Sequence, residues 1–200
     1  MKQMQKRLII GKVEKDSRFR GGIEELYFNV FTGYPWYDEI DLEGSKRICK
    51  RYFDDNNYTV LGGLEDGELI GFVIIKDVDG NEVPDSISKF NKQNLRALYI
   101  EETGINPECQ KQGLGKELLE YVMEKYSNCF IYFTTNNSPD SPMIKLTQSL
   151  GFEPVTDENN NVKAFSQDEE KGSPTERCAL FYNNVRSKEE QDKQSDEEVR

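Results

Sequence analysis

Hydrophobic positions recur along the chain with the spacing of both helices and strands. Residues 22–31 carry apolar side chains at helical intervals, including Ile23, Leu26 and Val30, and residues 42–53 repeat this pattern. Each segment therefore predicts an amphipathic helix near the N-terminal end of the chain.

Runs rich in β-branched and aromatic residues predict the strands. Residues 58–64 and 69–76 form two such runs, and the turn residues 65–68 between them indicate a hairpin. The polar stretch 78–94 predicts an inserted loop. The remaining expected elements are strands at 7–13, 95–105, 129–135, 153–164 and 177–182, and helices at 114–126 and 142–150.

A strand, a glycine-bearing turn and a helix N-terminus follow one another in residues 100–119. Gly113 and Gly115 let the backbone approach an anion, while the first helical turn offers unpaired N–H groups and the positive end of its dipole. This combination predicts a phosphate site, and a pyrophosphate is the ligand that we expect.

The spacing of this turn separates three kinds of pyrophosphate site. A Walker loop needs glycine where this chain has Gln110, and Ser or Thr where it has Glu117, which argues against ATP and GTP. A dinucleotide fingerprint needs a third glycine at the position of Leu118, which argues against NAD. A glycine turn without a ligand is the alternative interpretation.

A second motif follows the strand-like run at 129–135. Asp140 or Ser141 can cap a helix that Pro142 starts and Gly151 ends. Taken alone, this segment also suits an amphipathic core helix.

Together the two motifs resemble the signatures of the GNAT superfamily of acyl-CoA-dependent N-acetyltransferases. They are Gln-x-x-Gly-x-Gly, with Gln110, Gly113 and Gly115, and Leu-x-x-x-Leu-Gly-Phe at 146–152. The resemblance covers residues 8–182 and implies an α/β (α+β) fold. In this fold a mixed central sheet of about seven strands is splayed near its middle and flanked by about four helices.

Composition agrees with one soluble domain. A chain of 200 residues with 36% hydrophobic content can bury one sizeable core, and no apolar run approaches the ~20 residues that cross a membrane. We expect a single domain at 1–184 and a charged, disordered tail at 185–200. No signal peptide is visible, so a cytoplasmic protein is expected, and a homodimer stays open as its assembly.

The chain contains no histidine, and its four cysteines are not closely spaced. We therefore expect no metal site and reduced thiols, and any proton transfer must use carboxylates, tyrosines, lysines, thiols or water. The net charge of −11 argues against nucleic acid as a partner and favours a small cationic amine as substrate.

The resemblance implies direct attack of a substrate amine on the thioester of acetyl-CoA. The central strand would contact the acyl-pantetheine arm, with the Ile105 N–H at the carbonyl oxygen, and the glycine turn would surround the pyrophosphate. The implied cofactor-binding residues are Thr103, Gly104, Ile105, Gln110, Lys111, Gln112, Gly113, Leu114, Gly115, Lys116 and Asn136.

Two carboxylates on the central strand are candidates for removing the proton of the amine. Glu101 is the first choice and Glu102 the second, and the two-residue period of a strand places them on opposite faces. A structural ion pair or a strand-edge carboxylate is the alternative role for either residue.

One departure from the family pattern concerns the leaving thiolate. Many relatives have a tyrosine where this chain has Thr147, and the threonine hydroxyl is too short and too weakly acidic to act in the same way. Either another group or water replaces the phenol, or the protein is a noncatalytic acyl-CoA-binding or regulatory module.

The acceptor pocket that the family implies lies between the first two helices and the late hairpin. Aromatic rings and carboxylates together suit a cation, although Trp36 and Tyr37 could equally close the core. Polyamines, amino sugars such as aminoglycosides, amino acids and protein amines all stay open. The candidate residues are Tyr34, Trp36, Tyr37, Asp38, Glu39 and Glu25.

Overall fold

A mixed sheet of eight strands, in the order β1-β2-β3-β4-β5-β8-β6 with β7 beside β8, organises the chain. The structure, a computed structural model, describes residues 8–33, 38–138, 141–165 and 177–184. The strands are β1 (Ile9–Lys12), β2 (Tyr58–Glu65), β3 (Glu68–Val78), β4 (Arg96–Ile105), β5 (Cys129–Asn136), β6 (Glu153–Pro154), β7 (Ala164–Phe165) and β8 (Arg177–Asn184).

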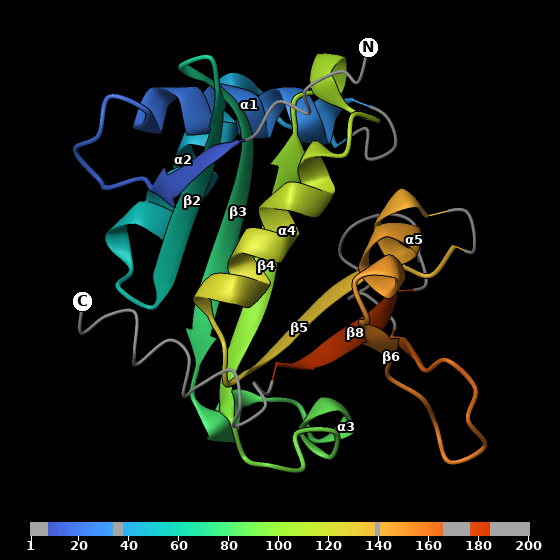
Figure 1. Ribbon diagram of the computed structural model, residues 1–200. Helices are drawn as coiled ribbons and strands as arrows, with labels where there is room; N and C mark the ends of the chain where they lie inside the picture. The colour runs from blue at the N-terminus through green and yellow to red at the C-terminus, as the bar shows by residue number, and fades with distance from the viewer. Residues whose placement is uncertain (1–7, 34–37, 139–140, 166–176, 185–200) are drawn as a thin grey trace, which may run out of the picture.

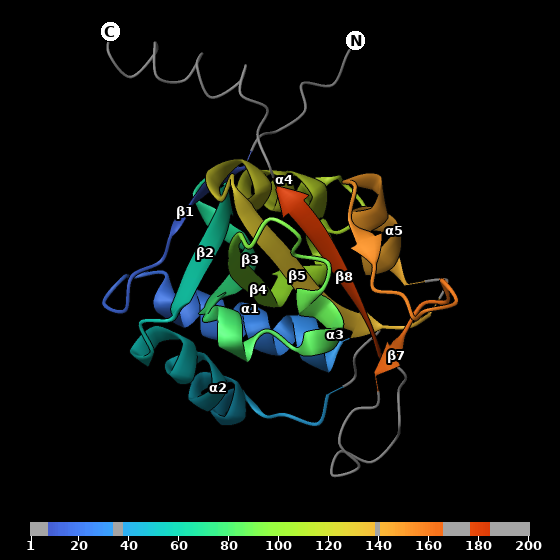
Figure 2. The ribbon, with the colours of Figure 1, turned by 90° about the horizontal axis from the view of Figure 1, so that it is seen from below.

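Helices cover both faces of the sheet. Figure 2 shows α1 and α2 below the sheet and α4 and α5 above it. Each layer has its own core, one around Ile23, Tyr27 and Phe72, the other around Leu118 and Phe133. The helices are α1 (Arg20–Thr32), α2 (Leu42–Asp54), α3 (Asp85–Ser88), α4 (Leu114–Lys125) and α5 (Pro142–Ser149).

The predicted fold class and the order of the main elements are confirmed. Residues 78–94 are more than a loop, because they form a short 3-10 turn at Gly80–Glu82 and helix α3. Val83 and Ile87 of this insert pack against Phe130 and Phe181. The insert therefore covers the lower end of the sheet with an apolar surface of its own.

The expected strand at 153–164 is instead two short strands, β6 and β7, around a turn. The carboxylate of Asp157 accepts hydrogen bonds from the backbone N–H groups of Asn159 at 2.8 Å and Asn161 at 2.9 Å. An aspartate that bonds its own backbone in this way favours a turn over a strand.

Strands β4 and β5 pair along only part of their length. Their parallel register runs from Arg96 beside Cys129 to Tyr99 beside Tyr132 and then stops. Beyond this point β4 stays paired with β3 and β5 stays paired with β8. Figure 1 shows the resulting separation of β4 from β5 toward α5. Backbone groups of residues 100–105 that point away from β3 therefore have no strand partner.

Two general facts apply to the described residues. Within them, none of the helices combines the length and apolarity that crossing a bilayer requires. All four cysteines are free thiols, and three of them are buried.

The contact between α1 and β4 leaves no room for a side chain at Gly104. A Cβ there would lie 2.9 Å from both γ-carbons of Val30 and 2.8 Å from Cε1 of Phe72. These two neighbours are buried in the core, so they cannot move aside cheaply. Gly104 thus sets how closely α1 approaches the central strand.

We expect Gly104→Ala to lower the free energy of unfolding by about 1–3 kcal/mol, because overpacking a dense core costs this much. Gly11→Ala in β1 is the matched control, since a Cβ at Gly11 has no atom within 4 Å. Denaturant unfolding of both variants measures the difference. Equal free energies of unfolding of the two variants would show that the packing of α1 on β4 does not require glycine at position 104.

Candidate active site

The two glutamates of the central strand lie on the same face of the sheet. Ile74 of β3 pairs with Glu102, but Ile75 pairs with Ile100, so Glu101 is an extra residue in β4. Such a bulge interrupts the two-residue alternation of side chains. The expectation that Glu101 and Glu102 lie on opposite faces is therefore wrong.

Both carboxylates contact the layer of α1 and α2. Oε1 of Glu102 accepts a hydrogen bond of 3.1 Å from the hydroxyl of Tyr27 in α1. Oε1 of Glu101 lies 3.6 Å from Nη2 of Arg51 in α2. The bulge thus brings two carboxylates to the edge of the gap between β4 and β5.

Glu102 has an unusual electrostatic environment for a carboxylate. Burial raises its pKa to about 7, and the nearby charges of Glu101 and Asp38 act in the same direction. The hydrogen bond from Tyr27 and the charge of Arg177 act against this rise. A carboxylate with a pKa near neutrality can both accept and release a proton at physiological pH.

Tyr27 keeps its proton beside this carboxylate. Burial raises the pKa of the Tyr27 phenol far above its usual range, and the charge of Glu102 raises it further. The phenol therefore stays a hydrogen-bond donor and fixes the position of the Glu102 carboxylate. Its ring is held in turn by Phe31, with ring centroids 4.5 Å apart.

Polar groups also line the side of the gap that β5 and β8 form. The hydroxyls of Tyr99 and Thr134 lie 2.9 Å apart across the point where β4 and β5 separate. Nη2 of Arg177 donates to the carbonyl oxygen of Thr134 at 3.4 Å. The charge of Arg177 reaches both Tyr99 and Glu102, so these groups share one polar region.

The glycine turn has the backbone shape that the predicted anion site requires. Gly113, with φ of 85°, precedes α4 and supplies no side chain to cap it. The N–H groups of Lys116 and Glu117 donate to the carbonyl oxygen of Gly113, so those of Leu114 and Gly115 are the ones that the first helical turn offers to an anion. Gln110 donates from Nε2 to the carbonyl oxygen of Ile105 at 3.2 Å, which ties the turn to the end of β4.

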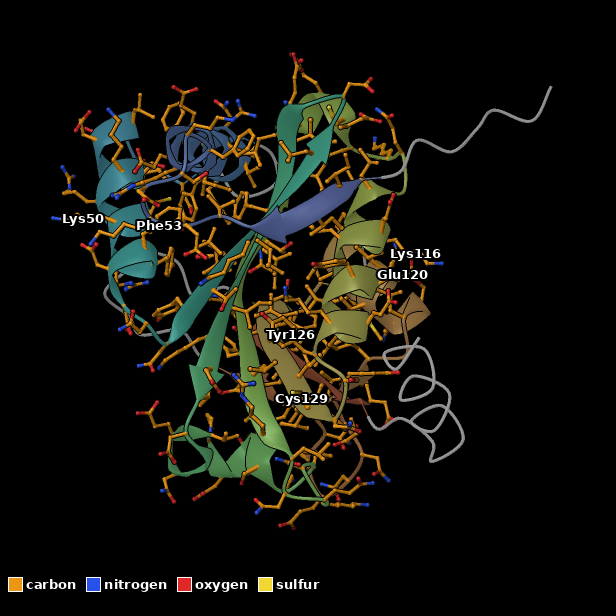
Figure 3. All side chains as sticks on the ribbon, turned by 60° about the vertical axis from the view of Figure 1, so that its left-hand side comes forward. Lys50, Phe53, Lys116, Glu120, Tyr126 and Cys129 are labelled. Atoms are coloured by element: carbon orange, nitrogen blue, oxygen red, sulfur yellow. The ribbon has the colours of Figure 1, made fainter. Side chains whose placement is uncertain are left out.

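The charged residues around this turn are exposed. Lys111, with φ of 62°, and Gln112 are both exposed beside Gly113. Lys116 lies 3.6 Å from Glu120 one helical turn on, and Figure 3 shows both on the outer side of α4. Gly115 and Leu114 face inward, because Leu114 is buried and a Cβ at Gly115 would contact Leu146 at 3.5 Å.

Two further predicted cofactor residues lie on β4 and β5, the strands that separate. The hydroxyl of Thr103 donates to the carbonyl oxygen of Phe72 at 3.1 Å, so this side chain is hydrogen-bonded within the sheet. Asn136 ends β5 opposite Arg177 and is half-buried. Thr135 beside it is 2% exposed, and its hydroxyl has no hydrogen-bond partner among the described residues. This hydroxyl is closed to solvent, so it is a polar group of the interior.

Thr147 directs its hydroxyl into its own helix. It is fully buried in α5, and Oγ1 donates to the carbonyl oxygens of Met143 at 2.8 Å and Ile144 at 3.2 Å. A hydroxyl has one proton, so none is left for a ligand.

The predicted acceptor residues are only partly brought together. Tyr34, Trp36 and Tyr37 lie outside the described residues. Asp38 and Glu39 are exposed, and Asp38 is close enough to raise the pKa of Glu102. Glu25 is exposed on α1, on the side of the helix opposite Tyr27, because two residues along a helix turn by about 200°.

Sequence reasoning missed Tyr27, Arg51, Thr135 and Arg177 as site residues. Tyr27 counted only as an apolar position of a helix, although its hydroxyl was a signal that a buried tyrosine needs a partner. The two arginines have no sequence signal, because their place in the site depends on how α2 and β8 pack around β4.

Comparison with known proteins agrees with this architecture. The model of the acetyltransferase (GNAT) family matches residues 22–152. The structure is similar to the ribosomal-protein-S18-alanine N-acetyltransferase from Escherichia coli, with 16% identity and a TM-score of 0.61 over 91% of this chain and 97% of that one.

Two further structures show the same fold. For Arabidopsis thaliana NAA60 in complex with acetyl-CoA, the identity is 19% and the TM-score 0.64, over 88% of this chain and 97% of that one. For aminoglycoside 6'-acetyltransferase type Ii, the identity is 12% and the TM-score 0.62, over 90% of this chain and 99% of that one. No curated protein sequence matches the chain at a significant level.

Proposed function

Because the chain belongs to the acetyltransferase (GNAT) family, we propose that it is an N-acetyltransferase that moves an acetyl group from acetyl-CoA to a primary amine. The observation that carries this proposal is Glu102, a carboxylate with a pKa of about 7 at the edge of the gap between β4 and β5. Family members use acetyl-CoA, and the gap suits it.

Backbone groups of the protein on the side of α4 and α5 fit acetyl-CoA. The N–H groups around Gly113 would hold its pyrophosphate. The unpaired edge of β4 at Thr103 to Ile105 would hold the amides of its pantetheine arm. Bound acetyl-CoA supplies an acetyl group activated as a thioester.

Glu102 would prepare the acceptor for attack. An ammonium group has no lone pair, so one proton must move from its nitrogen to a base. Below pH 7 the Glu102 carboxyl is largely protonated, and above pH 7 it is an anion that accepts this proton. Tyr27 holds Oε1 of Glu102, so the carboxylate faces the gap in one orientation.

Backbone groups of β4 would stabilise the charge that develops on the carbonyl oxygen. We assign this to the N–H of Ile105, at the unpaired end of the strand, and it stays a prediction. Thr147 takes no part in proton transfer in this proposal, because its hydroxyl is bonded within α5.

The same hydrogen bonds of Thr147 favour a second candidate function. A protein without a donor near the leaving sulfur could bind acyl-CoA as a noncatalytic or regulatory module. Release of free CoA thiol in the presence of acetyl-CoA and any amine would exclude this alternative. A cytoplasmic location, a homodimer and a cationic acceptor stay predictions.

The position of the cofactor is tested at Gly113. We expect Gly113→Asp to weaken CoA binding at least tenfold, about 1.4 kcal/mol, because it places a negative charge where the pyrophosphate lies. Isothermal titration calorimetry with CoA measures this affinity.

Two controls separate charge from backbone strain. Gly113→Asn has nearly the same shape without the charge and should lose much less affinity. Gly67→Asp changes a glycine with φ of 87° and open space around it, as at Gly113, but in the hairpin turn between β2 and β3. Unchanged CoA binding in Gly113→Asp would refute the proposed pyrophosphate site.

The role of Glu102 is tested by its pH dependence. We expect Glu102→Gln to lower kcat/KM by about 10² or more and to remove the inflection near pH 7 that deprotonation of Glu102 gives the native enzyme. Glu101→Gln is the matched control, because it removes the neighbouring carboxylate and its contact with Arg51. The Glu101 variant should keep the inflection. The opposite result would make Glu101 the base.

A further inference from the structure

A pocket of about 360 Å³ opens beside α2. It is lined by Ile40, Gly44, Arg47, Ile48 and Arg51. The last four belong to one face of α2, because residues three and four apart on a helix are neighbours. Two of the five lining side chains are arginines, so the pocket pairs apolar walls with a positive rim.

Arg51 connects this pocket to the candidate base. Its Nη2 lies 3.6 Å from Oε1 of Glu101, the neighbour of Glu102 in β4. The same Nη2 donates to the hydroxyl of Tyr52 at 3.0 Å, which holds the guanidinium in place. Arg51 is therefore common to the pocket lining and to the contact with Glu101.

Arg47 supplies a charge that the described residues leave unpaired. In those residues it has no carboxylate within ion-pair distance, and its Nη2 lies over Gly44. The carboxylates nearby are engaged elsewhere. Asp41 accepts from the N–H of Gly44 at 2.6 Å, and Glu43 pairs with Lys46 at 2.7 Å.

The charge of a third arginine, Arg177 of β8, reaches Glu102. The Nε of Arg177 is buried without a hydrogen-bond partner in the part of the chain that the structure describes. A buried donor without an acceptor costs free energy. The guanidinium group of Arg51 thus lies near Glu101, and the charge of Arg177 reaches Glu102.

We propose that the acceptor is an amine that also carries a carboxylate, and that Arg47 and Arg51 bind this carboxylate in the pocket beside α2. The inference rests on the proposed acetyltransferase function and names its substrate class. Arginine is the side chain best suited to carboxylates, because its planar fork donates two parallel hydrogen bonds.

The acceptor is then bipolar, unlike the cationic amine that the net charge alone favours, with its amine toward Glu102 and its acid toward α2. Arg47 lies one helical turn, about 6 Å, beyond Arg51 along the helix axis. An extended peptide advances about 3.3–3.6 Å per residue, so the side chain of its second or third residue could reach Arg47. A free acidic amino acid presents the same chemistry to Arg51. A polyamine would instead place a second ammonium against two guanidiniums.

The proposal is tested with a panel of acceptors at fixed acetyl-CoA concentration. The panel contains peptides that begin Ala-Glu-Glu, Ala-Gln-Gln and Ala-Lys-Lys, free glutamate, spermidine and an aminoglycoside. We expect the Ala-Glu-Glu peptide or glutamate to have the highest kcat/KM, and whichever of the two is higher identifies the source of the carboxylate. A higher value for a neutral or basic acceptor would overturn the proposal and leave the acetyltransferase function standing. No turnover on any amine would count against the function itself.

Variants of α2 show whether the pocket is responsible. We expect Arg47→Gln to lower the ratio of kcat/KM for Ala-Glu-Glu over Ala-Gln-Gln tenfold or more, mainly through KM, and Arg47→Glu to favour Ala-Lys-Lys. Lys50→Gln is the matched control, because it removes one positive charge from the same helix outside the pocket lining, and Figure 3 shows Lys50 pointing away from the protein. The Lys50 variant should keep the native ratio. An equal fall of the ratio in both variants would overturn the assignment to Arg47.

Discussion

The separation of β4 from β5 beyond Tyr99 determines what this fold can bind. A strand inside a sheet normally uses all its backbone groups for pairing, but residues 100–105 keep one edge without a strand partner. This edge offers hydrogen bonds to an extended ligand, and the helix N-terminus after Gly113 offers its N–H groups to a phosphate at the same end of the sheet. Under the proposed function, these two features would hold two parts of a single cofactor.

On the side of α1 and α2, the position of the two glutamates depends on the bulge at Glu101. The extra residue turns both glutamates toward α1 and α2, where Tyr27 and Arg51 meet them. Close packing of Val30 on Gly104 brings α1 near enough for this contact. Burial then raises the pKa of Glu102 toward neutrality. Packing of a helix on a strand and the chemistry of the carboxylate are therefore coupled.

The sequence was sufficient to predict those features that local residue types encode. Glycines before an amphipathic helix predicted the turn at Gly113, and the spacing of apolar residues predicted α1 and α2. It failed at Glu101, because nothing in two adjacent glutamates reveals a bulge, and the two-residue period then gave the wrong face. Arg51 and Arg177 could not be found, because only tertiary packing brings them to β4.

Hydrogen exchange of the β4 amides, measured with and without saturating CoA, tests the role of the gap most directly. The amides of Ala97 to Tyr99 lie where β4 is paired on both sides and should exchange slowly in either condition. In the free protein, the amides of Thr103 to Ile105 that face away from β3 should exchange faster than those of Ala97 to Tyr99. Their exchange rate should fall at least tenfold when CoA binds. Exchange of these amides that stays unchanged at saturating CoA would contradict a cofactor held by the open edge of β4.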